Sequence, residues 1–233
     1  MKNSTQRILE RQGYHIAVLA VLVGLFWWTA GVEPFRGGAF LGIPTPTWLL
    51  VAFLVPTVHQ VVLTVWWRTR LERDTSKPAR RAEFIGYLVF FFVLFVGRMA
   101  TIVPLAISNA GAIAVGPPIR VAVAVLFFVP SAYLFYSVFA YFGLVRAAGA
   151  DHFDPAYQTK PFVRRGIFRF TSNGMYTYGL LVLWIPGIVL ASPAAILVAA
   201  FQHVYIWVHY FCTELPDMRR IYGRAATDTE HGA

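Results

Sequence analysis

The chain has 233 residues, of which 58% are hydrophobic, 16% are aromatic and only 13% are charged. A soluble domain needs more polar surface, so this composition indicates an integral membrane protein. The formal net charge of +9 does not indicate nucleic-acid binding, because the basic residues are scattered over loops between apolar stretches, as positive-inside topology and attraction to anionic lipid require. Cys212 is the single cysteine, which excludes an internal disulfide and a cysteine metal cluster.

The first apolar stretch covers residues 14–30 and follows a short basic segment. Small residues at positions 29–31 leave a cleaved signal peptide open as an alternative. Bulky Phe26, Trp27 and Trp28 lie just where a cleavage region should be small, so we interpret the stretch as a retained membrane span. A Gly/Pro-rich loop over residues 31–47 follows.

The second predicted span, residues 48–66, contains two polar residues, His59 and Gln60. Such groups must face protein or water rather than acyl chains. The most charged stretch of the chain, residues 68–83, comes next and contains six basic residues. We interpret it as a solvated loop.

The third predicted span, residues 84–107, carries Arg98 well inside it. A guanidinium at that depth is costly unless it is paired or hydrated, so Arg98 is either a functional residue or a structural, snorkelling one. We predict that it faces the protein interior, near a polar partner. The fourth span, residues 119–145, is long enough to tilt or to project beyond the bilayer.

Residues 146–172 are too polar for a span and too aromatic for a plain linker, which favours an interfacial segment or re-entrant cover. Two closely spaced apolar stretches follow, residues 176–190 and 193–212. The Ser192-Pro193 turn between them predicts a tight helical hairpin. The sequence therefore predicts an all-α polytopic membrane protein with six transmembrane helices, forming one domain over residues 1–233, with four spans over 14–145 and the hairpin region over 146–223.

An even number of spans places both termini on the same side of the membrane. With six spans, 17 of the 20 Lys and Arg residues fall on that side, Arg36 and Arg120 fall on the other, and Arg98 lies within a span. Such an asymmetry predicts that both termini are cytoplasmic, in a bacterial inner membrane or the endoplasmic reticulum.

Few side-chain groups match a known catalytic pattern. His152 with Asp151 and Asp154 could form a metal site or an acid–base pair, but the ligands are too few for a metal and a solvated loop is the simpler interpretation. His203 and His209 lie six residues apart, which aligns them poorly on a helix and indicates separate packing roles.

The two ends of the predicted hairpin are more informative. Glu214 lies immediately after the last span, and Arg169 lies just before the preceding one, on the same side. A hairpin brings its ends together, so an acid and a base can line one pocket and hold a zwitterion. In the alternative, Glu214 pairs with Arg219 or Arg220 and the preceding arginines bind lipid headgroups.

Two motifs at these ends resemble a known superfamily. "GIFRFTSNGMY" (166–176) resembles the "GPYRYVRHPMY" pattern of the isoprenylcysteine and phospholipid methyltransferase superfamily, and "ELPDMRRIYG" (214–223) resembles its "EEPELEKRFG". The hairpin between them is most similar to the phosphatidylethanolamine N-methyltransferases. Upstream, "KPFVRRG" (160–166) resembles the superfamily's "HxLVxxG" and keeps Val163 and Gly166. The chain departs from these three motifs at Lys160, Ser172, Gly174 and Leu215, which stand where the family has His, Arg, Pro and a second Glu.

The resemblance implies methyl transfer from S-adenosylmethionine to a lipid or lipid-like acceptor, most readily a phospholipid amine, at the cytoplasmic surface. It implies that Glu214 binds the cofactor ammonium and that Arg169 binds the cofactor carboxylate or a lipid phosphate. The proton of an amine acceptor is expected to pass to water or to His152. The residues expected at the catalytic centre are His152, Arg169 and Tyr176, and those expected to bind the cofactor are Val163, Gly166, Arg169, Asn173, Gly174, Met175, Tyr176 and Glu214.

Two other function classes remain open from the sequence. Membrane sterol reductases have an "F-x-x-S-x-x-x-Y" block before a hairpin, and Ser172 and Tyr176 match its second half, which leaves open an NADPH-dependent sterol or enone reductase. That block normally continues with a glutamate, where this chain has Tyr178 and Gly179. A non-catalytic membrane protein could also retain the fold. No metal and no nucleic-acid partner is expected, and the oligomeric state is left open.

Overall fold

The structure is a computed structural model and describes residues 3–73 and 77–223. Its long helices are α2 (Gln12–Ala30), α3 (Thr45–Leu71), α4 (Arg81–Ser108), α5 (Pro117–Ser137) and α10 (Pro193–His209). Its short α-helices are α1 (Ser4–Ile8), α6 (Leu144–Ala147), α7 (Pro155–Gln158), α8 (Gly174–Thr177), α9 (Ile185–Val189) and α11 (Leu215–Tyr222). Three 3₁₀ segments, η2 (Ala150–His152), η3 (Gly166–Arg169) and η4 (Gly179–Trp184), and two π-helical segments, η1 (Val138–Phe142) and η5 (Tyr210–Glu214), complete the helical elements. The protein is an all-α polytopic membrane protein, as the sequence predicts.

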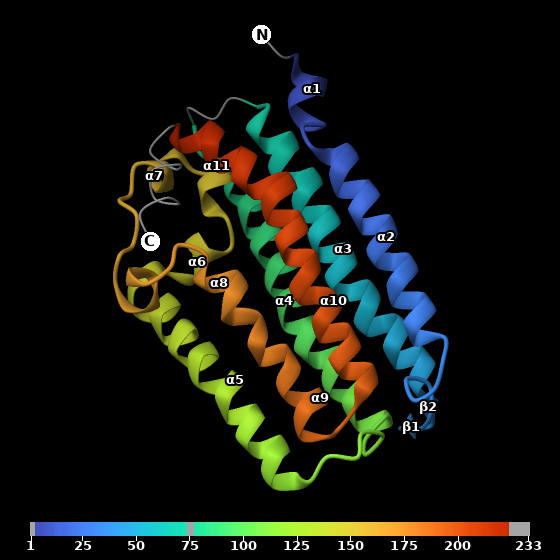
Figure 1. The fold of residues 1–233 in the computed structure, drawn as a ribbon. Helices are drawn as coiled ribbons and strands as arrows, with labels where there is room; N and C mark the ends of the chain where they lie inside the picture. Colours follow the sequence, from blue (N-terminus) through green and yellow to red (C-terminus); the bar gives the residue numbers. More distant parts are fainter. Residues whose placement is uncertain (1–2, 74–76, 224–233) are drawn as a thin grey trace.

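Consecutive long segments run in opposite directions along one bundle (Figure 1). Within the described residues, five helices are long and apolar enough to cross a membrane: Ser4–Ala30, Thr45–Leu71, Arg81–Ser108, Pro117–Phe142 and Pro193–Tyr222. Helices α1, α7 and α11 lie at one end, with the connection from α3 to α4. We call this the basic end, because the segments that carry most of the arginines meet there. Lys2 and Arg224, counted among the basic residues, lie outside the described residues.

The fifth predicted span, residues 176–190, is shorter than the others and interrupted, although it still runs in the opposite direction to α10 (Figure 1). Residues 174–189 form a shorter apolar helix in three pieces, α8, η4 and α9. The helix is interrupted because Gly174, Gly179 and Gly187 have low helix propensity and Pro186 lacks an N–H donor. The glycines allow close packing: a Cβ at Gly179 would lie 2.7 Å from Leu134, and one at Gly187 would lie 2.8 Å from the Ile196 side chain.

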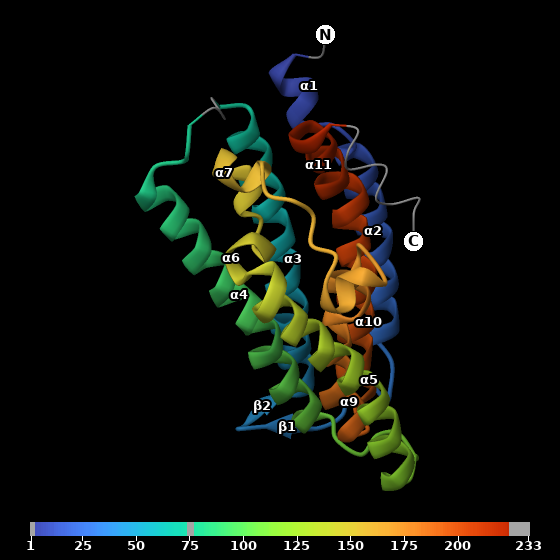
Figure 2. The ribbon, with the colours of Figure 1, turned by 90° about the vertical axis from the view of Figure 1, so that its left-hand side faces the viewer.

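A two-stranded antiparallel ribbon, β1 (Ala39–Phe40) and β2 (Ile43–Pro44), occupies the loop between α2 and α3. The sequence analysis predicted only a loop. Leu41 and Gly42, the two turn residues, both have positive φ, the backbone that a two-residue hairpin turn demands. The ribbon lies at the end of the bundle opposite the basic end (Figure 2).

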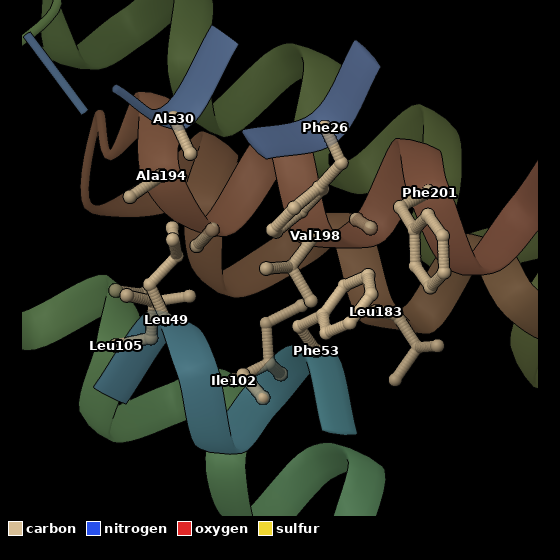
Figure 3. Close-up of a cluster of buried hydrophobic side chains, with 14 of the residues drawn as sticks. Phe26, Ala30, Leu49, Phe53, Ile102, Leu105, Leu183, Ala194, Val198 and Phe201 are labelled. Carbon is tan, nitrogen blue, oxygen red and sulfur yellow. The ribbon is translucent and has the colours of Figure 1, made fainter. Parts of the chain in front are cut away.

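The main apolar core lies between α2, α3, α4 and α10 (Figure 3). Phe26, Phe53 and Phe201 pack together there, with ring centroids of Phe26 and Phe53, and of Phe53 and Phe201, 4.7 Å apart. Small residues on α10, such as Ala194 and Ala195, let the neighbouring helices approach closely, as membrane bundles favour. Helix α5 lies outside this core and is inclined to α10 (Figure 2), and the site occupies the space on that side.

Candidate functional site

A cavity of about 770 Å³ is lined by α3, α4, α5, the 144–183 region and the end of α10. Its volume is in the range of small-molecule binding sites. Val96 of α4 and Phe139 of η1 both line the cavity and are exposed, so the cavity reaches the outer surface between these helices. At that depth the outside is lipid, because both helices have the composition of membrane spans.

Glu214 lines this cavity at the basic end. The hydroxyl of Tyr176, on α8, donates a hydrogen bond to its carboxylate. Glu214 makes no ion pair with any described residue, and Arg220 is paired instead with Glu72, at 2.7 Å. The hairpin therefore brings Glu214 and Arg169 to one cavity, and Glu214 contacts Tyr176. Among the described residues, the alternative ion pair of Glu214 with Arg219 or Arg220 does not form.

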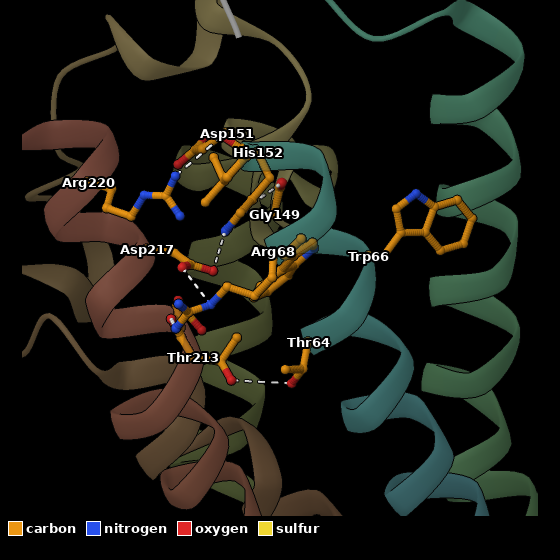
Figure 4. Close-up of polar contacts among 12 residues, drawn as sticks. Thr64, Trp66, Arg68, Gly149, Asp151, His152, Thr213, Asp217 and Arg220 are labelled. Atoms are coloured by element: carbon orange, nitrogen blue, oxygen red, sulfur yellow. Dashed lines mark hydrogen bonds and ion pairs between the residues drawn. The ribbon is translucent and has the colours of Figure 1, made fainter. Parts of the chain in front are cut away.

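A buried ion pair holds the segment that carries Glu214 (Figure 4). Arg68 Nε and Asp217 Oδ1 are 2.9 Å apart, and both side chains are fully buried. The same guanidinium donates to the carbonyl oxygens of Cys212 and Thr213, at 3.1 and 3.2 Å, and to that of Arg7 at 2.8 Å. A π-helical turn breaks the i→i−4 ladder, and Arg68 supplies donors to its carbonyls. We call Arg68, Asp217 and the two carbonyl groups of η5 the arginine lock.

The expectation that the loop beginning at Arg68 is solvated is wrong for its first residues. Helix α3 continues to Leu71, and both Arg68 and Arg70 are buried. Arginine at the end of an apolar stretch looks like a membrane-flanking residue in the sequence. The partner that buries Arg68, Asp217, lies 149 residues later, so no local signal could find it.

His152 is buried too, against the expectation of a solvated loop. Its ring stacks on Trp67 with centroids 4.2 Å apart. Nδ1 lies 3.3 Å from the carbonyl oxygen of Gly149, and Nε2 lies 3.3 Å from Asp217 Oδ2. Both neighbours are hydrogen-bond acceptors, so both ring nitrogens are directed at protein groups.

Gly149 makes the stacking of His152 possible. Its φ is +84°, and a Cβ at this position would lie 2.5 Å from a ring carbon of Trp67. Only glycine meets both conditions without strain. In the sequence, Gly149 is one isolated glycine and does not indicate a site.

Asp151 is a buried carboxylate on the cavity wall. The Tyr222 hydroxyl donates to its Oδ2 at 2.5 Å, and Arg146 Nε lies 3.9 Å from its Oδ1. Burial raises the pKa of Asp151 above its ordinary value, and the hydrogen bond from Tyr222 and the charge of Arg146 partly oppose this rise. A carboxylate with a raised pKa inside a cavity is a candidate proton acceptor.

The residues between 163 and 176 that are expected to bind the cofactor divide into two groups. Five of them line the cavity: Val163, Arg169, Asn173, Met175 and Tyr176. Arg169 is exposed there, and its guanidinium lies over the ring of Phe170 at 5.3 Å.

Gly166 and Gly174 pack against α5 instead of lining the cavity. A Cβ at Gly166, whose φ is +61°, would lie 2.4 Å from Ser137 Oγ, and one at Gly174 would touch Leu134 at 3.4 Å. The hydroxyl of Ser137 also accepts a hydrogen bond from the N–H of Ile167, at 3.0 Å. These glycines set the position of the loop against α5.

The deep part of the cavity is lined by His59, Gln60 and Arg98, which are all buried. Arg98 Nη2 lies 3.2 Å from His59 Nδ1. The prediction that Arg98 faces the protein interior near a polar partner is confirmed, as is the prediction for His59 and Gln60.

The two histidines of α10 have different partners, as their spacing predicts. His203 Nδ1 accepts from Trp184 Nε1 at 3.1 Å, and His209 Nδ1 lies 3.2 Å from Thr64 Oγ1. Among the described residues, no group of three or more His, Cys, Asp or Glu side chains is arranged to hold a metal ion.

A model of the phospholipid methyltransferase family matches residues 119–225. This segment contains all of the residues expected at the catalytic centre and at the cofactor, from His152 to Glu214, and the match confirms the resemblance to the isoprenylcysteine and phospholipid methyltransferase superfamily. Helices α2, α3 and α4, with Arg68 and Arg98, lie outside the matched segment. No curated protein and no solved structure matches the chain.

Proposed function

Because residues 119–225 match a family of phospholipid methyltransferases, we propose that this membrane protein transfers a methyl group from S-adenosylmethionine to a lipid acceptor, most readily a phospholipid amine. The observation that carries the proposal is Glu214. Its carboxylate lies in the matched segment and on the cavity wall, and it makes no ion pair with any described residue.

The cavity has the groups that S-adenosylmethionine needs. Glu214 would pair with the ammonium, and Arg169, which lines the same cavity, would pair with the carboxylate. Asn173 and the backbone near Val163 would hold the remainder. When bound, S-adenosylmethionine supplies an electrophilic methyl group.

The chain would contribute binding, orientation and proton removal. The arginine lock fixes η5 and so the position of Glu214, while Tyr176 orients its carboxylate. An ammonium acceptor must lose a proton before its nitrogen can attack. We assign the proton to a carboxylate oxygen of Asp151, in place of His152. Both residues line the cavity, but Asp151 has a raised pKa and the ring nitrogens of His152 are directed at Gly149 and Asp217. His152 then acts as a positioning residue for Asp217.

We also propose that the basic end faces the cytoplasm, with both termini on that side. The distribution of 17 of 20 basic residues supports this orientation. It places Glu214, Asp151 and Arg169 where a soluble cofactor can reach them, at the depth of lipid headgroups.

Calorimetric titration of the purified protein in neutral detergent with S-adenosylmethionine and with NADPH tests the proposal. We expect binding of S-adenosylmethionine and none of NADPH, followed by methyl transfer to phosphatidylethanolamine in vesicles. Binding of NADPH alone would indicate the reductase class instead. Failure to bind either ligand would overturn the enzymatic assignment and favour a non-catalytic protein.

A further inference from the structure

The deep part of the cavity contains a cation without a counter-ion. Arg98 lies on α4 and is 4% exposed, and no carboxylate among the described residues pairs with it. His59 lies twelve residues before the end of α3, which is about 18 Å along the helix from the basic end. A guanidinium held at such depth in a membrane span is costly and marks a functional site by default.

The hydrogen bond between Arg98 and His59 determines what the pair can bind. A guanidinium only donates, so His59 Nδ1 must accept, and the proton of the neutral ring is then on Nε2. Among the described residues, neither His59 Nε2 nor Arg98 Nε has a hydrogen-bond partner. Two N–H donors are therefore left unsatisfied on side chains that line the cavity. Buried donors without partners call for an acceptor.

The walls beside this pair are apolar. Phe91, Phe95 and Met99 of α4 face the cavity from one side, and Phe135 and Phe139 face it from the other. The cavity reaches the lipid between these helices, as described above for Val96. A ligand that reaches Arg98 by this route must have an apolar chain and one negatively charged group.

We propose that Arg98 and His59 form an oxyanion subsite that binds the carboxylate or phosphate group of an amphiphile inside the membrane. One guanidinium without a neighbouring acid matches a single negative charge. The subsite lies outside the segment matched by the methyltransferase family, and it goes beyond the proposed methyl transfer and does not depend on it.

Photolabelling of the wild-type protein with a diazirine-bearing fatty acid, in neutral detergent, tests the subsite. We expect labelled residues among the cavity walls of α4 and α5. Dodecanoate and dodecyl phosphate should compete with the label, and the one effective at the lower concentration identifies the preferred oxyanion. Dodecanol, with the same chain and no charge, should not compete. Equal competition by dodecanol, or labelling confined to lipid-facing residues outside the cavity, would overturn the proposal.

Arg98→Gln removes the charge and retains a polar side chain. The dodecanoate or dodecyl phosphate concentration for half-competition should rise about 10- to 150-fold, the loss expected for one charge-assisted hydrogen bond. Arg165→Gln is the matched control, because Arg165 lies over the Tyr141 ring at 4.8 Å and is not among the cavity-lining residues. Unchanged competition in Arg98→Gln would overturn the proposal.

A second readout separates this subsite from the methyltransferase assignment. Arg98→Gln should bind S-adenosylmethionine as the wild type does. If the wild type binds no S-adenosylmethionine but its labelling is competed by anionic amphiphiles, the proposed function fails and the subsite stands. If Arg98→Gln does not fold, the wild-type comparison of dodecanoate with dodecanol still decides.

Discussion

Arg68 and Arg98 are both buried arginines of the same bundle, but their surroundings are opposite. Arg68 pairs with Asp217 at 2.9 Å and donates to three carbonyl oxygens. Arg98 makes no ion pair with any described residue, and its hydrogen bond is to His59, at 3.2 Å. The first arginine joins α3 to η5 and α11, while the second lines a cavity. Arg68, whose charge is paired, stabilises the fold. Arg98, whose charge has no counter-ion among the described residues, is the one that we propose binds a ligand.

The carboxylates of the C-terminal motif show the same contrast. Asp217 is fully buried between Arg68 and His152, whereas Glu214, three residues earlier, contacts Tyr176 on the cavity wall. Asp151 is intermediate, since it accepts from Tyr222 and lies 3.9 Å from Arg146. Burial alone therefore does not identify a functional charge, and the number of its partners is the better guide.

The largest effect is expected from breaking the arginine lock. Arg68→Met leaves Asp217 buried beside His152 alone, and the free energy of unfolding should fall by about 3–5 kcal/mol. Arg98→Met, the matched variant, removes a charge that has no counter-ion among the described residues, so stability should change little or rise. Denaturation with SDS in mixed micelles measures both. If the free energy of unfolding fell equally in the two variants, the ion pair of Arg68 would not make it more important for stability than Arg98.

Asp151→Asn should slow methyl transfer by about 10²- to 10⁴-fold, the usual contribution of a general base. A base must be ionised, and burial raises the pKa of Asp151 above its ordinary value of 3.8. Wild-type activity should therefore fall as the pH decreases through this raised pKa, and the variant should lack that acidic limb. The pH profile of kcat/KM is the measurement. If the limb persists in Asp151→Asn and disappears in His152→Gln, the base is His152.

Glu214→Gln keeps the shape of the side chain and removes its charge. The affinity for S-adenosylmethionine should fall about 10- to 150-fold, which corresponds to about 1.5–3 kcal/mol for a charge-assisted hydrogen bond. Glu83→Gln is the control, because Glu83 pairs with Arg73 at 2.9 Å and is not a cavity-lining residue. Calorimetric titration of the two folded variants decides; wild-type affinity in Glu214→Gln would remove Glu214 from the cofactor site.

The smallest effect concerns a clasp at the basic end, in which Glu72 binds Arg7 and Arg220 at 2.6 and 2.7 Å. The hydrogen bond from Arg7 lowers the pKa of Glu72 from 4.5 to about 2. A lowered carboxyl pKa means that the stabilisation is complete above pH 4.5 and is lost as the pH falls toward 2. Because both arginines are partly exposed, the contribution is about 0.2–1 kcal/mol.

Comparing the thermal midpoint of the wild type with that of Glu72→Gln measures this contribution. The two should differ at pH 7 and should converge as the pH falls below 4.5. A difference that is independent of pH would show that the charge of Glu72 does not stabilise the clasp.

Much of the fold follows from patterns along the chain. Apolar length predicts the long helices, because each must satisfy its backbone hydrogen bonds internally in lipid. The interruption of the helix at residues 174–189 was not predicted, because glycine fits an apolar stretch in the sequence. In the structure, Gly179 and Gly187 allow Leu134 and Ile196 to pack closely against this helix. The short ribbon before α3 was missed because its turn depends on the backbone conformation of Leu41 and Gly42.

The candidate site divides in the same way. The two motifs at the hairpin ends locate Glu214, Arg169 and Tyr176, because these motifs are contiguous in the sequence. The prediction of a solvated loop was wrong for Arg68, Asp151 and His152. Each is buried by partners from distant parts of the chain, and burial of a charge by a distant partner leaves no periodic or local signal.

The sequence by itself determined the membrane environment, the helical class and the family resemblance of the C-terminal segment. All three depend on composition or on contiguous residues. Only the tertiary structure decided which buried charges have ion-pair partners. Arg68 and Arg98 look alike in the sequence, as basic residues within or beside apolar stretches. They differ because the lock to Asp217 forms when α11 docks against α3, whereas α4 and α5 enclose a cavity beside Arg98.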